Sequence, residues 1–164
     1  MTRPRIFTIG YEGADILALI TALRSTGVAR VVDVRHSPYS QRPEFSKDEL
    51  RAALQDYGIA YTHIEALGNP PAGREAARAG HMASYKSVYS AHLESIDGRK
   101  GLAKLMELAA AEAVCMLCLE KSAGHCHRGM IAEKYAALTG QTVEHLRVAA
   151  SASHPGQHAF DFTS

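Results

Sequence analysis

The chain has few of the features of secreted or membrane proteins. Among its 164 residues there are three cysteines, an odd and small number that argues against a disulfide framework. The amino-terminal sequence MTRPRIFTIGYEG reaches polar residues and glycines before any long apolar run, so neither a signal peptide nor a membrane span is predicted. From these absences we expect a cytoplasmic protein that does not contact a membrane.

The chain also lacks an excess of one charge. Its 18 Lys and Arg residues against 17 Asp and Glu give a formal net charge of +1, which provides no global field to attract nucleic acid. A composition with 46% hydrophobic and 21% charged residues is ordinary for a globular protein. Length and composition predict one domain over 1–148, followed by a tail over 149–164 that has no clear pattern.

Short apolar runs alternate with segments that have the apolar spacing of helices. Ser46 and Glu49 have the spacing of a capping box, and Gly58 and Gly140 fit helix ends. The segment 97–101 reads as a turn, and the glycine- and proline-bearing segment 67–73 reads as a loop long enough to be a lid. The pattern predicts strands over 5–9, 28–34, 59–64, 114–119 and 142–148, and helices over 15–26, 47–58, 85–96, 102–111 and 126–138. This alternation is typical of a single-domain α/β three-layer sandwich, Rossmann-like, with a mainly parallel sheet of about five strands.

Polar residues follow the predicted strands. Gly10, Tyr11 and Glu12 come after the first strand, Asp33 and Arg35 end the second, and Glu120 follows the fourth. Ligands of open α/β sheets bind beyond the carboxyl ends of the strands, so these residues are candidates for one site. The alternative is that Gly10 and Gly13 only form a turn, while Asp33 and Arg35 pair with each other. The GYEG sequence lacks the third glycine of a dinucleotide motif.

The strongest local feature is CLEKSAGHCHRGMIA at 118–132, where a helix is predicted to begin near Cys126. A helix amino terminus favours anions, and Arg128 could grip a phosphate or carboxylate there. The same field would make the Cys126 thiolate more available as a nucleophile, and His127 could carry a proton near neutral pH. Alternatively, Cys126 packs as a small apolar residue, and Arg128 pairs with Glu120 or Asp33.

The other cysteines and the histidines leave a metal as an open alternative. Cys115 and Cys118 lie within one predicted strand, where alternate faces separate them, and both are interpreted as core. Several residue types that ligate metals lie close in sequence, but their spacing fits no standard zinc pattern, so no metal ligand is assigned and the cofactor is unknown. These residues are Cys118, Glu120, His125, Cys126 and His127.

Two further groups could serve binding. Tyr85, Tyr89 and His92 share a helix face that could line a pocket, or could pack with the phenol groups in water. A nucleic-acid-binding module is the alternative to an enzyme, with tyrosines as stacking surfaces and a set of arginines on the phosphates, although the net charge argues against it. That set is Arg35, Arg42, Arg74, Arg78 and Arg128.

Five motifs together resemble the domain of unknown function 488 family: TIGYEG at 8–13, DVRHSPYS at 33–40, YTHIEALGNP at 61–70, YKSVY at 85–89 and the 118–132 segment. The resemblance extends from Thr8 to about Leu146 and implies a small bacterial or archaeal cytosolic α/β protein, with no activity attached. The segment after Gly68, NPPAGREAARAGH, departs from the family in its many alanines. The signature positions matched here are Gly10, Tyr11, Asp33, Arg35, Pro38, His63, Leu67, Gly68, Glu120, Cys126, His127 and Arg128.

The residues and the resemblance lead to one leading hypothesis. The chain is expected to be a hydrolase or group transferase that acts on a small anionic or nucleotide-like ligand. The expected catalytic residues are Asp33, Glu120, Cys126 and His127, and the expected ligand-binding residues are Gly10, Tyr11, Arg35, His63, Tyr85 and Arg128. A metal-dependent or thiol-sensing protein centred on Cys126 and His127 is the third hypothesis.

Overall fold

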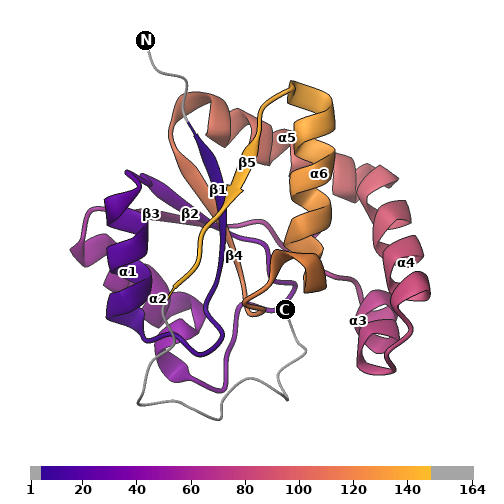
Figure 1. The fold of residues 1–164 in the computed structure, drawn as a ribbon, viewed down its shortest axis with the longest axis horizontal. Coiled ribbons are helices and arrows are strands. Elements are labelled where there is room, and N and C mark those ends of the chain that lie inside the picture. The colour runs from indigo at the N-terminus through magenta and orange to yellow at the C-terminus, as the bar shows by residue number, and fades with distance from the viewer. Residues whose placement is uncertain (1–4, 149–164) are drawn as a thin grey trace.

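A computed structural model describes residues 5–148, so the predicted tail at 149–164 lies outside the described residues. Five strands form one sheet in the order β3-β2-β4-β1-β5, and every neighbouring pair is parallel (Figure 1). The strands are β1 (Ile6–Gly10), β2 (Arg30–Asp33), β3 (Ala60–His63), β4 (Val114–Cys118) and β5 (Val143–His145). The predicted α/β class with a parallel sheet of about five strands is confirmed.

Helices cover both faces of the sheet. On one face, α1 (Ile16–Ser25) and α2 (Lys47–Asp56) pack over a core that includes Phe7 and Cys115, and the remaining helices lie on the other face (Figure 1). Those helices are α3 (Pro71–Arg78), α4 (Met82–Glu94), α5 (Ile96–Ala111) and α6 (His127–Thr139). The short 3₁₀ helices η1 (Pro43–Phe45), η2 (Glu65–Leu67) and η3 (Ala123–His125) lie in the connections.

The segments with the clearest sequence pattern form the predicted elements. β4 is buried at all five positions, as expected for a continuous apolar run in the centre of a covered sheet. Gly58 and Gly140 have φ values of 75° and 73° just beyond α2 and α6, a left-handed conformation that glycine adopts without steric penalty. The observed strands begin or end within a few residues of the predicted bounds, and the difference is largest for β5.

Three local predictions were wrong. Ser46 makes no capping hydrogen bond to α2, because its hydroxyl instead accepts from the backbone N–H of Ser40 at 3.1 Å. The segment 67–73, expected to be a loop and a candidate lid, contains the start of α3. The expected turn at 97–101 is helical within α5.

The glycine at position 98 explains the last error. Gly98 is buried in the first turn of α5, where a Cβ would overlap the carbonyl oxygen of His92 and lie 2.8 Å from the Cα of Leu93. Gly98 therefore serves the close approach of α5 to the end of α4, and tertiary packing overrides its low helix propensity.

The central strands create the place for a ligand site. The chain leaves β1 toward α1 on one face and leaves the neighbouring β4 toward α6 on the other. In open α/β sheets, ligands bind beyond the carboxyl ends of strands whose connections diverge in this way. The predicted site residues stand at this edge.

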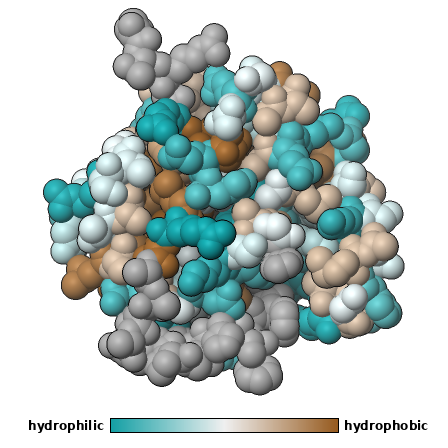
Figure 2. Space-filling model, viewed as in Figure 1, coloured by the Kyte–Doolittle hydropathy of each residue, from teal (hydrophilic) through white to brown (hydrophobic). Residues whose placement is uncertain are grey.

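The surface of the molecule is mixed in character. Figure 2 shows hydrophilic side chains over most of the viewed face, with the larger hydrophobic patch toward α1. Leu17 of α1 is 59% exposed and belongs to that helix's outer side. Within residues 5–148, none of the helices has the length and apolar character needed to cross a bilayer.

We expect Gly98→Ala to lower the free energy of unfolding by about 1 to 3 kcal/mol, because the overlap with His92 outweighs the gain of about 1 kcal/mol in helix propensity. The comparison is Lys100→Ala, an exposed position on the same helix that should change stability by less than about 0.5 kcal/mol. Urea denaturation of both variants measures the difference. A Gly98→Ala protein as stable as the wild type would contradict the packing explanation.

Candidate functional site

A buried ion pair lies at the end of β2. Nε and Nη2 of Arg35 donate to the two carboxylate oxygens of Asp33 at 2.9 and 2.7 Å, and both residues are fully buried. Arg35 Nη1 also donates to the Tyr11 hydroxyl at 3.2 Å and to the Phe45 carbonyl at 2.8 Å. Tyr61 donates to Asp33 Oδ2 at 2.5 Å. The structure therefore brings the predicted residues of the first two strands together.

This pair satisfies its own charges. Burial alone would lower the pKa of Arg35, but the hydrogen bonds and charge of Asp33 raise it above its ordinary value. Burial and the charge of Asp33 likewise raise the pKa of Tyr61. His63, at the end of β3, bonds through Nε2 to the Arg35 carbonyl at 2.7 Å. The sequence analysis gave a pairing of Asp33 with Arg35 as the alternative to a ligand site. That pair is present, and it holds the end of β2 in place.

A second buried arginine is in a different situation. Arg128 lies in the first turn of α6 and is fully buried, yet its Nε and Nη1 have no hydrogen-bond partner among the described residues. Nη2 donates to the Lys121 carbonyl at 3.1 Å. Burial lowers the pKa of Arg128, while the charge of Glu120 acts in the opposite direction. A buried cation with two unpaired donors is energetically costly unless an anion completes it.

The start of α6 is also unusual for a helix. Its N-cap, Cys126, makes no side-chain capping bond, and its first turn contains no acidic residue. Helix amino termini carry partial positive charge and normally attract Asp, Glu or a capping hydroxyl. Here the sequence places the positive side chain of Arg128 there instead, so the local field is doubly favourable to an incoming anion.

Gly10 allows the backbone at the end of β1 to lie close to Glu120 and Arg128. A Cβ at this position would overlap the Glu120 carbonyl oxygen and lie 3.1 Å from Arg128 Nη2. The backbone N–H groups of Tyr11 and Glu12 donate to the carbonyls of Cys118 and Leu119 at 3.2 and 2.8 Å, which extends the β1–β4 pairing beyond the strands. Gly10 thus serves a close backbone approach beyond forming a turn.

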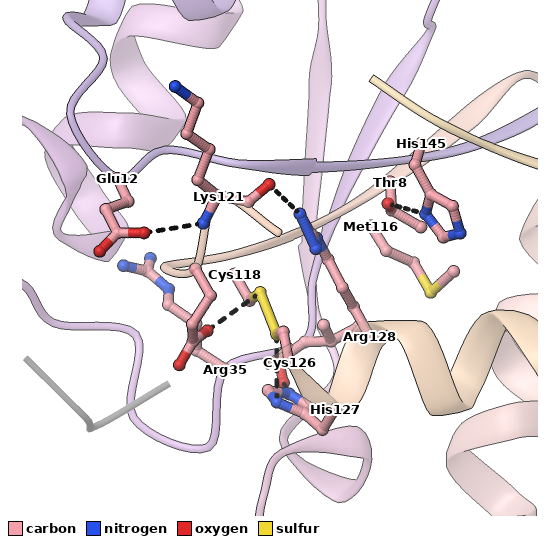
Figure 3. Close-up of a disulfide and its surroundings, with 12 residues drawn as sticks. Thr8, Glu12, Arg35, Met116, Cys118, Lys121, Cys126, His127, Arg128 and His145 are labelled. Atoms are coloured by element: carbon pink, nitrogen blue, oxygen red, sulfur yellow. Dashed lines mark hydrogen bonds between the residues drawn. A yellow bond between two sulfur atoms is a disulfide. The ribbon is translucent and has the colours of Figure 1, made fainter. Parts of the chain in front are cut away.

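The cysteines differ from the prediction in one respect. Cys115 is a free buried thiol on the α1 and α2 side, as expected, and burial raises its pKa. Cys118, predicted to be core only, instead forms a disulfide with Cys126 (Figure 3). The expectation missed this bond because the two residues are eight apart in sequence and meet only when α6 folds back on β4. In the disulfide, Cys126 has no thiol to act as a nucleophile.

His127 is held as a neutral base. Its Nε2 lies 2.6 Å from the Val34 carbonyl, so Nε2 carries the proton and donates, and Nδ1 faces Cys126 Sγ at 3.6 Å. Burial lowers the pKa of His127 to about 4, and the Arg128 charge acts in the same direction. A pKa that low disfavours the expected role as a proton carrier near neutral pH.

Glu120 and Tyr85 are the remaining residues of the candidate site. Glu120 is half-buried, and its Oε2 lies 3.4 Å from Cys118 Sγ. Burial and then the charge of Glu120 raise the pKa of Tyr85, a buried residue of α4. Tyr89 donates to the Leu67 carbonyl at 2.5 Å and packs edge-on against His127. Both tyrosines of α4 are therefore buried, and the Tyr89 hydroxyl bonds to the backbone, whereas the alternative had placed it in water.

The arginines expected for nucleic acid do not form an exposed stripe. Arg35 and Arg128 are fully buried, and Arg42 is 6% exposed. Arg42 packs over Phe45, its Nε donates to Glu44 at 3.0 Å, and both Nη atoms lack a hydrogen-bond partner among the described residues. The sequence analysis named Arg42 only as a candidate phosphate contact, because no local pattern signals that its side chain is buried.

The same substitution should affect stability to very different extents at the two buried arginines. Arg35→Met should lower the free energy of unfolding by about 3 to 5 kcal/mol, because it leaves the Asp33 carboxylate buried without its cation. Arg128→Met should change it by no more than about 1 kcal/mol, because the lost bond to Lys121 is offset by removal of two unpaired donors. Urea denaturation measures both values. Equal losses would mean that Arg128 is a structural counter-charge like Arg35.

The stability of the oxidised protein should rise with pH between about 4 and 6.5. Burial depresses the pKa of His127 to about 4 from the ordinary 6.5, so in this window the unfolded chain binds a proton that the folded chain does not. We expect a contribution of up to about 1.4 kcal/mol per pH unit. His127→Gln keeps a donor for Val34 and removes the titration, so its urea-unfolding profile should be flatter. Parallel profiles would contradict a buried neutral imidazole.

Comparison with known proteins identifies the family but supplies no activity. The family model described as "Domain of unknown function DUF488" matches residues 15–135, a span that includes Asp33, Arg35, His63 and the whole 118–132 segment. No curated protein and no solved structure is significantly similar to the chain. The match covers well over half of the sequence and agrees with the resemblance carried by the motifs. The chain is a member of the domain of unknown function DUF488 family.

Proposed function

We propose that this protein is an enzyme, a hydrolase or group transferase, that acts on a small anionic ligand at the carboxyl ends of β1, β2 and β4. One observation carries the proposal: Arg128 is fully buried at the start of α6 with two of its nitrogens unpaired. A phosphate or carboxylate accepting from Nε and Nη1 would satisfy both donors at once, in the bidentate geometry that guanidinium groups favour. The α6 amino terminus would add its dipole to the same anion.

The two arginines would have different tasks. Arg35 is held by Asp33 and Tyr11 and its charge is balanced by Asp33, so it is a positioning residue. Arg128, which Figure 3 shows near the sulfur pair, is the buried charge with two donors still unpaired. Such fixed charges stabilise negative charge that develops during acyl or phosphoryl transfer without reorganising.

Among the predicted acid–base residues, Glu120 is the better candidate. It is half-buried beside Arg128, whereas both oxygens of Asp33 already accept hydrogen bonds in the core. A carboxylate that water and substrate can reach can exchange a proton, and a buried carboxylate paired on both oxygens is poorly suited to do so. The predicted role of Cys126 as a nucleophile would require reduction of its bond to Cys118.

A thermal-shift screen of the full-length protein tests the binding step, using orthophosphate, dicarboxylates, sugar phosphates and nucleoside phosphates. A ligand at about a hundred times its dissociation constant stabilises the fold by about 2.7 kcal/mol, a shift of about 5 to 10 °C for a domain of this size. We expect one anion class to give this shift in the wild type. The shift should vanish in Arg128→Met and persist in Arg99→Met, whose side chain is 71% exposed.

Catalysis is separated from binding with Glu120→Gln. This variant should keep the thermal shift from the stabilising anion class while losing its turnover by about 100-fold or more, in line with loss of a general acid or base. If the shift is identical in wild type and Arg128→Met, the anion site is wrong. If it depends on Arg128 but no ligand is turned over, the protein binds anions without catalysis.

A further inference from the structure

We propose that the reduced protein binds a thiophilic divalent cation of the zinc class through Cys118, Glu120 and Cys126. One ligand atom from each of these residues lies within 4.8 Å of the other two. Two thiolates and a carboxylate form a donor set that suits zinc and similar ions. This inference adds to the proposed anion chemistry and does not depend on it.

The backbone places these donors before any ion binds. Cys118 is the last residue of β4 and Glu120 follows two residues later, with its Oε2 3.4 Å from Cys118 Sγ. Cys126 approaches from the N-cap of α6, after the chain has reversed through η3. The Cα atoms of the two cysteines are 7.6 Å apart, beyond the range of about 4.4 to 6.8 Å usual for disulfides, a separation that leaves room for an ion between reduced sulfurs.

The environment favours an ion with an open coordination position. Cys118 and Cys126 are buried, whereas Glu120 is half-buried, so the sulfur side of the cluster is dry and the carboxylate side reaches solvent. Three protein ligands with one further position for water or substrate is the arrangement of catalytic zinc sites, while structural sites use four. An ion held so would acidify a bound water and polarise an anionic substrate.

Charge balance supports the same donor set. Two thiolates and one carboxylate with a divalent cation leave a net charge of −1 beside the buried guanidinium of Arg128. That residual negative charge offsets the positive charge of the Arg128 guanidinium. The unpaired Nε and Nη1 of Arg128 remain able to bind an anion. His127 is not in the group of three residues whose ligand atoms lie within 4.8 Å of one another. The centre therefore differs from the Cys126–His127 pair that the sequence suggested.

Disulfide and metal are alternative states of the same two sulfurs. A thiol reductant supplies two electrons and two protons to the Cys118–Cys126 bond and becomes a disulfide itself, leaving two thiols. Binding of the divalent ion then releases both thiol protons to solvent. In this state Cys126 serves as a ligand, in place of the nucleophile expected from the sequence.

Cobalt(II) provides the direct test, because thiolate ligation gives intense near-ultraviolet charge-transfer absorption. The full-length protein is reduced with a phosphine, desalted without oxygen and titrated with cobalt, and zinc affinity follows from competition. We expect one equivalent bound by the reduced wild type and none by the oxidised protein. Loss of an outer-sphere partner alone weakens metal binding by roughly 10- to 100-fold. Cys118→Ser removes a ligand, so it should weaken cobalt binding by more than that. Glu120→Gln should keep the thiolate band with weaker affinity.

Two controls separate this proposal from the others. Cys115→Ser removes a buried thiol on the opposite face of the sheet and should leave the cobalt spectrum unchanged. Arg128→Met should also keep the spectrum while losing the anion-induced thermal shift, so each proposal can fail alone. If Cys118→Ser does not fold, Glu120→Gln still reports on the site. Absence of the thiolate band in the reduced wild type, or its equal presence in Cys118→Ser, would overturn the metal site.

Discussion

The carboxyl ends of β1 and β4 meet at Gly10, and the geometry of the site depends on that approach. Only a residue without a Cβ fits against the Glu120 carbonyl there, and the same contact sets Arg128 Nη2 close to the β1 backbone. Glu120 follows the end of β4 and Arg128 lies in the first turn of α6, so the positions of both depend on this contact. A steric constraint on one backbone atom thereby fixes a carboxylate and a guanidinium relative to the sheet.

Around this contact the protein treats two buried charges differently. Arg35 is balanced within the fold by Asp33 and Tyr11, which makes it part of the scaffold. Arg128 retains two unpaired donors at a helix amino terminus that has neither a capping side chain nor an acidic residue in its first turn. A folded protein that keeps such a charge gives up stability at that point, and this is characteristic of binding and catalytic sites.

Much of the scaffold could be predicted from local sequence. The fold class followed from the apolar run of β4 and the glycines that end α2 and α6. The polar residues after each strand indicated the edge of the sheet that bears the candidate site. The errors occurred where distant segments decide local structure. Gly98 reads as a turn but is helical because α5 packs tightly on the end of α4, and Ser46 bonds to Ser40 instead of capping α2.

The sequence by itself determined the parallel α/β architecture and indicated the candidate site residues, because hydrophobic periodicity and residue chemistry are local properties. Only the tertiary structure decided which of those residues are satisfied and which are open. It paired Asp33 with Arg35, joined Cys118 to Cys126, buried Arg42 and left Arg128 incompletely bonded. Hydrogen bonding and burial depend on distances between segments remote in sequence, and no spacing along the chain contains those distances.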